Sequence, residues 1–279
     1  MGGDIIDVGI PLGPVTVSVN GLLRKLFGRR EQGPTDVVAE RFLTLFGAHG
    51  VEVTQIPRLL PAVGLDMLNT RASLLKALTC DVLDGAARLF GVEREWLDGA
   101  TEVLYPCRCC YKRPQLFFDD LGAVRTDGLE FPVRALYSDK TLSGGSDRPQ
   151  PVVLLLVEKI AEFGDNEIQR FRVYYDSWDW GYFPARLQLK AMARIAFLEK
   201  QTPISLYRVP YRKLEMVREG KAVPRDLLTR SPLTSPSLED FALSPSESAQ
   251  SQEAEELPAV MEYISKHGLG CCEGSTKDR

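Results

Sequence analysis

Apolar residues between positions 35 and 100 recur at spacings of three and four, which is the period of an amphipathic α-helix. The segment "VVAERFLTLFGAHG" follows Thr35 and Asp36, and either side chain can cap a helix N-terminus. Gly50 closes the segment and is placed to end the helix. The pattern therefore predicts a helix that begins near residue 36 and buries one side.

A second helix is predicted where the chain reads "LTCDVLDGAARLFG". Thr79 is a natural N-cap, the apolar side chains after it form a broad stripe, and Gly91 stops the pattern. The following "VEREWLDG" predicts a short final helix that carries Trp96 and Leu97 inward. Residues 35–100 thus read as helices almost throughout.

From about residue 130 the pattern becomes that of strands. Three segments rich in valine, leucine and phenylalanine fit extended chain: 130–138, 150–163 and 167–175. The sequence "GDN" separates the last two, which predicts a hairpin and an antiparallel sheet. A helical pattern over 183–201 and a strand followed by a short helix over 203–217 complete an α+β domain.

The composition divides the chain into five parts. Residues 229–279 hold many serines, prolines and acidic side chains, so we predict a mostly disordered tail with one short helix over 257–268. The other four parts are a Gly/Pro-rich lead with a basic arm, a helical domain, a Cys-containing linker and an α+β sensor or interaction domain: 1–34, 35–100, 101–129 and 130–228. The expected fold class is multi-domain.

Composition places the chain among ordinary globular proteins. Of its 279 residues 44% are hydrophobic and 26% charged, and the net charge is −4, so any nucleic-acid contact must come from a local basic patch. The apolar N-terminus is broken by prolines and glycines, which argues against a membrane span. The sparse, clumped cysteines suit a reducing compartment, and we expect a cytoplasmic protein.

The sequence "LLKALTCDVLDGAARLFGVEREWLDG" resembles the closing two helices of phage-repressor-like (Xre-type) helix-turn-helix domains. The resemblance implies that residues 35–100 form an all-α domain like that of the λ repressor. Upstream, Thr54 and Gln55 match the pair with which the second helix of that family commonly opens. The resemblance covers about residues 36–100 and is degenerate over 62–73, where the family places its DNA-reading helix.

The resemblance implies a transcriptional regulator that binds double-stranded DNA, commonly as a homodimer. Contacts to bases would come from the second helix and the reading stretch: Gln55, Arg58, Asp66, Asn69 and Arg71. Contacts to phosphates would come from the basic arm: Arg24, Lys25, Arg29 and Arg30.

Charge supports a different interpretation of the same helices. Residues 35–100 hold six basic and nine acidic side chains, a balance of −3, whereas counterion release at phosphates requires basic groups on the docking face. The alternative function is a protein-interaction adaptor built on a helix-turn-helix scaffold that does not bind DNA. An enzyme in the α+β domain is a third alternative.

The segment "YYDSWDWGYF" concentrates aromatic side chains at the end of a predicted strand. It is a candidate wall for a small-molecule effector, formed by Tyr174, Asp176, Trp178, Trp180 and Tyr182. The same rings could instead fill the core between sheet and helix. These alternatives stay open at the sequence level.

The remaining chemistry-bearing residues do not form a recognisable site. Cys107, Cys109 and Cys110 lie too close together for one tetrahedral zinc site, and we interpret their segment as a basic, reduced linker between domains. His49 and His267 each precede a glycine at a predicted helix end. We predict no metal site, no cofactor and no catalytic residues.

Overall fold

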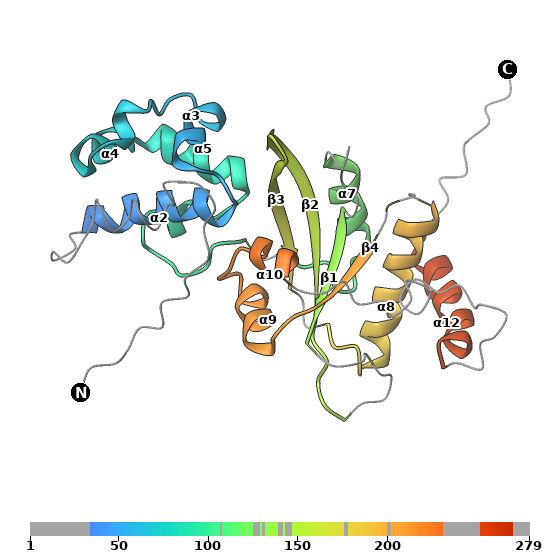
Figure 1. The fold of residues 1–279 in the computed structure, drawn as a ribbon. Helices are drawn as coiled ribbons and strands as arrows, with labels where there is room; N and C mark the ends of the chain where they lie inside the picture. The colour runs from blue at the N-terminus through green and yellow to red at the C-terminus, as the bar shows by residue number, and fades with distance from the viewer. Residues whose placement is uncertain are drawn as a thin grey trace, which may run out of the picture.

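The computed structural model describes residues 34–106, 108–124, 129, 132–138, 142, 147–175, 178–199, 202, 204–230 and 252–269. A four-stranded sheet stands at the centre, with helices against both of its faces (Figure 1). Its strands lie in the order β3-β2-β1-β4. Their bounds are Val133–Tyr137 for β1, Val152–Phe163 for β2, Asn166–Tyr174 for β3 and Ile204–Arg208 for β4. The predicted layout of helices followed by an α+β region is confirmed.

The pairing of the sheet is mixed. β2 and β3 form the predicted antiparallel hairpin, with Phe163 opposite Asn166, and β1 pairs antiparallel with β2. β4, however, pairs parallel with β1, and Val133 lies opposite Ile204. The prediction of an antiparallel sheet is therefore wrong for β4. A helix separates β3 from β4, and a crossover of that length permits the parallel pairing that a tight turn forbids.

The helices of the N-terminal part form a unit that spans residues 34–100, here called the helical unit. Its elements are α2 (Pro34–Ala48), η1 (Val53–Gln55), α3 (Ile56–Leu59), η2 (Asp66–Leu68), α4 (Arg71–Ala77), α5 (Cys80–Phe90) and α6 (Arg94–Leu97). The predicted ends of α5 are confirmed: the Thr79 hydroxyl accepts a hydrogen bond from the Val82 amide at 3.4 Å, and Gly91 adopts φ +69°. Leu97 is buried as expected, whereas Trp96 is only half-buried.

The second part of the chain adds helices on both sides of the sheet. They are α7 (Gln115–Ala123), α8 (Phe183–Arg194) with its π-helical extension η3 (Ile195–Glu199), α9 (Tyr211–Arg218), α10 (Arg225–Arg230) and α12 (Gln252–Lys266). α7 lies within the segment interpreted as a linker, and α12 includes most of the short helix expected in the tail. The lead before residue 34 lies outside the described residues.

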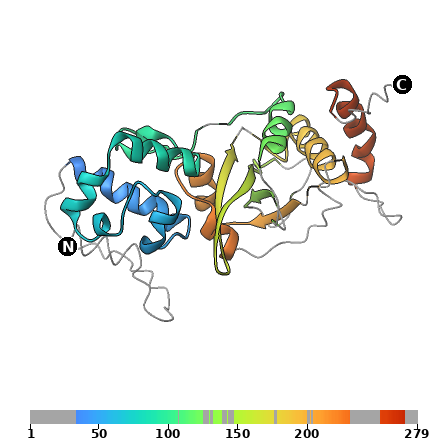
Figure 2. The ribbon, with the colours of Figure 1, turned by 90° about the horizontal axis from the view of Figure 1, so that it is seen from above.

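One face of the sheet shares its core with the helical unit. Val153, Leu155 and Val157 of β2 pack in one continuous apolar cluster with aromatic side chains of α2 and α5, among them Phe46 and Phe90. Polar contacts reinforce the junction: the Asn166 amide donates to the Gly50 carbonyl at 2.8 Å. The helical unit is thus packed against the sheet (Figure 2).

The other face of the sheet has a separate core. The intervening side chains of β2, Val152, Leu154 and Leu156, point the opposite way because side chains alternate along a strand. They belong to a second apolar cluster, which also contains side chains of α7, α8 and α12. All six residues from Val152 to Val157 are buried, which explains why this strand reads as a continuous apolar run.

No helix in the described parts of the chain combines the length and the apolar sequence that crossing a bilayer requires.

Candidate functional site

Arg71, expected near a DNA groove, is ion-paired inside the helical unit. Its guanidinium forms a bidentate contact with the Asp36 carboxylate, with Nε 2.5 Å from Oδ1. Asp36 is only 2% exposed, and it lies in the first turn of α2. A bidentate pair with a buried carboxylate fixes the arginine side chain. The contact therefore joins the beginning of α4 to the beginning of α2.

Arg58 and Gln55 also make contacts within the chain. The Arg58 guanidinium carbon lies 4.2 Å from the ring centre of Phe163, at the tip of the β2-β3 hairpin. The Gln55 side-chain oxygen accepts a hydrogen bond from the Glu52 amide at 2.9 Å. Arg58 nonetheless keeps an exposed side chain. Both residues thus help to hold the helical unit together or to attach it to the sheet.

The expected DNA-reading stretch 62–73 is not one helix. It contains the 3-10 turn η2, and a regular helix begins only at Arg71. Thr70 caps α4, since its hydroxyl accepts from the Ser73 amide at 3.1 Å. Asp66 and Asn69 are exposed. α4 lies at the end of the helical unit remote from the sheet (Figure 1).

The basic arm proposed to contact phosphates, Arg24, Lys25, Arg29 and Arg30, lies outside the described residues.

Tyr174 of the aromatic segment belongs to a charged cluster. Its hydroxyl donates to the Asp120 carboxylate at 2.5 Å, and that carboxylate also pairs with Arg108, at 2.8 Å, and with Arg172. Burial and the hydrogen bond to Asp120 raise the pKa of Tyr174. The cluster joins α7 to β3, so a structural role accounts for Tyr174.

The rest of the aromatic segment divides between core and surface. Trp178 and Trp180 are buried and pack in the second core, while Tyr182 is 56% exposed. The Val152 amide donates to the Trp178 carbonyl at 3.1 Å, which attaches the segment to the beginning of β2. Asp176 lies outside the described residues.

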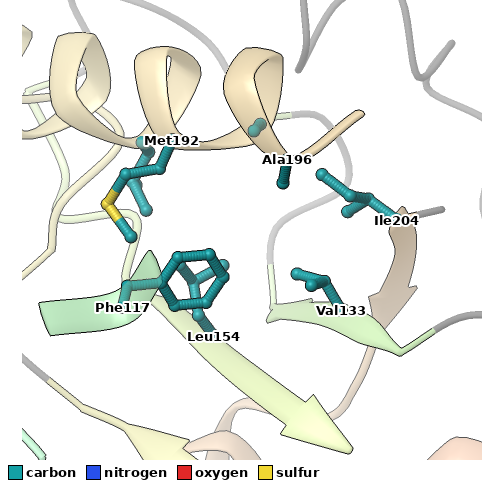
Figure 3. A pocket seen from close by; sticks show the side chains of 8 residues that line it. Phe117, Val133, Leu154, Met192, Ala196 and Ile204 are labelled. Carbon is teal, nitrogen blue, oxygen red and sulfur yellow. The ribbon is translucent and has the colours of Figure 1, made fainter. Parts of the chain in front are cut away.

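A small cavity lies between α8 and the sheet (Figure 3). Its volume is about 10 Å³, and its lining is apolar: Phe117, Val133, Leu154, Leu189, Met192, Ala193, Ala196 and Ile204. A cavity of this size scarcely holds one water molecule, and an apolar lining offers water no partner. It is a packing defect of the second core and not a ligand site.

The most distinctive group of charged residues lies between α8 and α12. Arg186 and Lys190 are 4% and 1% exposed, one helical turn apart, and both bind the carboxylate of Glu256. Arg186 Nη2 lies 2.6 Å from Glu256 Oε1, and Lys190 Nζ lies 2.7 Å from Oε2. We call these three residues the ion triad.

Aromatic and carbonyl groups surround the ion triad. Arg186 Nη1 donates to the Trp180 carbonyl at 2.6 Å, and Lys190 Nζ lies 5.5 Å from the centre of the Trp180 ring. Burial alone would raise the pKa of Glu256, but hydrogen bonds from Arg186 and Lys190 outweigh it and lower that pKa. The arrangement is a receptor for a carboxylate, built from a planar fork and a point charge.

Sequence reasoning missed the ion triad because its members are distant in the chain. Lys190 and Glu256 are separated by 66 positions. One signal was available: Arg186 and Lys190 recur at a spacing of four within the helical pattern 183–201, among small and apolar residues. Basic side chains placed on the buried side of a helix require an acidic partner.

His49 is buried between the helical unit and the sheet. Its Nδ1 lies 2.8 Å from the Leu45 carbonyl and its Nε2 lies 3.1 Å from the Tyr105 hydroxyl. A carbonyl can only accept, so Nδ1 carries the proton and Nε2 accepts from Tyr105. Burial lowers the pKa of His49 to about 4. The ring is therefore neutral at pH 7 and acts as a hydrogen-bonded core residue.

The cysteines of the predicted linker are separated by burial. Cys109 is exposed, Cys110 is buried, and neither forms a disulfide. Across the parts of the chain with described placement, no three His, Cys, Asp or Glu side chains gather as a metal ion would require. Cys107 lies outside those parts.

Comparison of the chain with protein-family models, with curated proteins and with solved structures finds no match.

Proposed function

We propose that this protein is an interaction adaptor whose helix-turn-helix-like unit is a structural scaffold and does not read DNA. One observation carries the proposal. The two basic side chains nominated for base contact, Arg58 and Arg71, are engaged within the chain, by Phe163 and by Asp36. Releasing Arg71 would leave the carboxylate of Asp36 buried without this partner, which costs free energy.

The packing of the helical unit supports the same proposal. Its aromatic core is continuous with the core on one face of the sheet. Arg170 of β3 also donates to the Arg88 carbonyl at the end of α5, at 3.1 Å. A unit held by a shared core acts as one body with the sheet, which suits a scaffold that presents surfaces to other proteins. Cys80 and Cys109 form no disulfide, which fits a reducing compartment such as the cytoplasm.

A DNA-binding regulator is the second candidate, and one observation favours it. α4 follows α3 after a connection, residues 60–70, that contains the 3-10 turn η2; α4 begins at the Thr70 cap and lies away from the sheet (Figure 1). Asn69 and Lys76 are exposed at its two ends. This is the order of elements in which a helix-turn-helix domain presents its reading helix.

Duplex binding separates the two candidates. A labelled 30-base-pair duplex of random sequence is titrated with the full chain at about 50 and 200 mM salt. We expect no saturable binding at protein concentrations up to about 100 µM, since non-specific DNA binders reach dissociation constants of about 1–100 µM. Binding that weakens steeply with salt would refute the adaptor.

A pair of charge reversals adds a control to this experiment. Lys76→Glu changes the exposed end of α4, and Lys266→Glu makes the same change on α12. A regulator that reads DNA through α4 requires the first change to abolish binding and the second to leave it intact. An adaptor gives no difference between the two variants.

A further inference from the structure

α12 is joined to the rest of the described structure by an unusual connection. Between the end of α10 at Arg230 and the beginning of α12 at Gln252 stand 21 residues rich in serine, proline and acidic side chains. α12 packs chiefly against α8 (Figure 1). α12 is therefore joined to α10 through these 21 residues, here called the tether, and is held mainly by its contact with α8.

The sequence of α12 makes it a weak helix by itself. Pro258 lies inside it, where a proline removes a backbone hydrogen bond and costs about 3 kcal/mol relative to alanine. Val260 and Ile264 are buried on the side that meets the second core. The helical form of this segment thus depends on contact with α8. A segment that folds on docking also unfolds on release.

The charges beneath α12 are not balanced. Arg186 and Lys190 together carry two positive charges, and Glu256 supplies one negative charge. Within the described residues, Arg186 also donates to the carbonyls of Trp180 and Gly181, at 2.6 and 3.3 Å, and its guanidinium carbon lies 5.4 Å from the ring centre of Phe183. Two buried cations are costly without an anion between them, so this face of α8 requires a carboxylate to cover it.

We propose that this face of α8 is a docking site for an acidic amphipathic helix, and that α12 is its resident occupant in the absence of a partner protein. The partner helix carries a glutamate that takes the place of Glu256. Apolar side chains follow one, four and eight positions later, as Leu257, Val260 and Ile264 do in α12. Recognition is of the helix-in-groove type.

The tether sets how strongly α12 competes. Covalent linkage within one chain gives an effective concentration on the order of millimolar, so an external helix must outcompete α12 at that concentration. Loss of the Glu256 charge weakens α12 and favours the external helix. The docking site therefore stays closed until a partner helix binds more tightly than α12 does.

A synthetic peptide of residues 252–269 tests the proposal. The peptide carries a fluorophore, its ends are blocked, and its binding to the full chain is followed by anisotropy. We expect the Glu256→Gln chain to bind at least about tenfold more tightly than the wild-type chain, because the peptide keeps the glutamate that the variant lacks. Glu262→Gln, the same change at an exposed position of α12, should bind like the wild type.

A change on the receptor side tests the ion triad itself. Adding Lys190→Met to the Glu256→Gln chain should abolish peptide binding, whereas adding Lys213→Met, at an exposed position of α9, should not. Thermal unfolding of each variant confirms that the body remains folded. Equal binding of the peptide to wild type and Glu256→Gln, or none to Glu256→Gln, would overturn the proposal.

The α8 docking site specifies the kind of partner that the proposed adaptor binds. It depends on the adaptor proposal only in treating the chain as an interaction protein. The two can fail separately. Salt-sensitive duplex binding would end the adaptor proposal and leave the α8 site untouched. Failure of the peptide to bind would remove the α8 site and leave the assignment of the helical unit as it is.

Discussion

The two faces of the sheet are closed by different chemistry. On the side of the helical unit, the buried polar groups of the junction are neutral, as in the contact of His49 with Tyr105. On the side of α8, the charged ion triad is buried beside neutral groups such as Gln188, and it joins α12 to α8. Both sides bury apolar side chains of β2.

This difference indicates which of the two junctions with the sheet stays closed. A junction of apolar and neutral groups loses stability whenever it opens, because the exposed surface is unfavourable in water. Buried charges recover hydration when they separate, so a charged junction loses less on opening. We therefore expect the helical unit to stay attached and α12 to be the part that moves.

The largest effect is expected in the core of the helical unit. Phe90→Ala removes a fully buried ring that packs against Phe46 and His49, and should lower the free energy of unfolding by about 3–5 kcal/mol. Trp96→Ala should cost less, about 1–2 kcal/mol, because that ring is only half-buried beneath Arg41. Denaturant unfolding measures both values. Equal losses for the two variants would contradict the packing described for α5 and α6.

The next effect is a dependence of stability on pH that arises from His49, on the side of the helical unit. Burial holds the pKa of His49 at about 4, below its ordinary value of 6.5. The unfolded chain therefore binds the proton first, and stability is complete above pH 6.5 and falls as the pH drops toward 4. The full loss amounts to about 3 kcal/mol.

Unfolding measured at several pH values checks the role of His49. His49→Phe should flatten the slope between pH 6.5 and 4, whatever its effect on stability at pH 7. His267→Phe serves as the control, since His267 is exposed. The carboxylate of Glu256 has a lowered pKa, so its contribution is present above its ordinary titration range and is lost only at more acidic pH. An unchanged slope in His49→Phe would show that another group titrates.

A smaller effect is expected from removing the tail. The composition of the tail alone predicts that deleting residues 230–279 leaves the melting temperature nearly unchanged. The structure revises this expectation, because α12 covers the second core with Val260 and Ile264. Deleting residues 231–279 should cost about 1–2 kcal/mol, or a few degrees by calorimetry. A loss as large as that of Phe90→Ala would make α12 an integral part of the fold.

The smallest effect concerns the contact between helical unit and hairpin. Arg58→Ala removes the guanidinium from the ring of Phe163 and should cost about 0.5–1 kcal/mol, the range for an exposed cation–π contact. Arg88→Ala, at an exposed position of α5, is the control and should be nearly neutral. If Arg58→Ala were also neutral, Arg58 would be available to a ligand.

Local features of the sequence predicted local features of the fold. The Thr79 cap, the Gly91 stop and the hairpin between β2 and β3 follow from a few adjacent residues, and all three are confirmed. Such features depend on backbone conformation and side chains within one turn. The beginning of α8 at Phe183 was predictable for the same reason, whereas the predicted helical pattern ran to residue 201 and α8 ends at Arg194.

Features that join distant segments were not predictable. Nothing near Ile204 specifies that β4 pairs with β1 and not with β3, since pairing depends on the crossover and on packing of the whole sheet. The contact of Arg71 with Asp36 and that of Lys190 with Glu256 likewise join residues far apart in sequence. The charge balance of residues 35–100 shows a shortage of basic groups, but it does not show which of those groups make contacts within the chain.

The alternation of β2 between the two cores has a consequence for dissecting this protein. Val153, Leu155 and Val157 complete the hydrophobic interior of the helical unit, so a fragment that ends near residue 100 would leave Phe46 and Phe90 without their cover. Such a fragment would expose these aromatic side chains to water and is expected to aggregate. Work on the helices therefore has to keep the central strand, and an apparent interaction of the isolated fragment would reflect that missing cover.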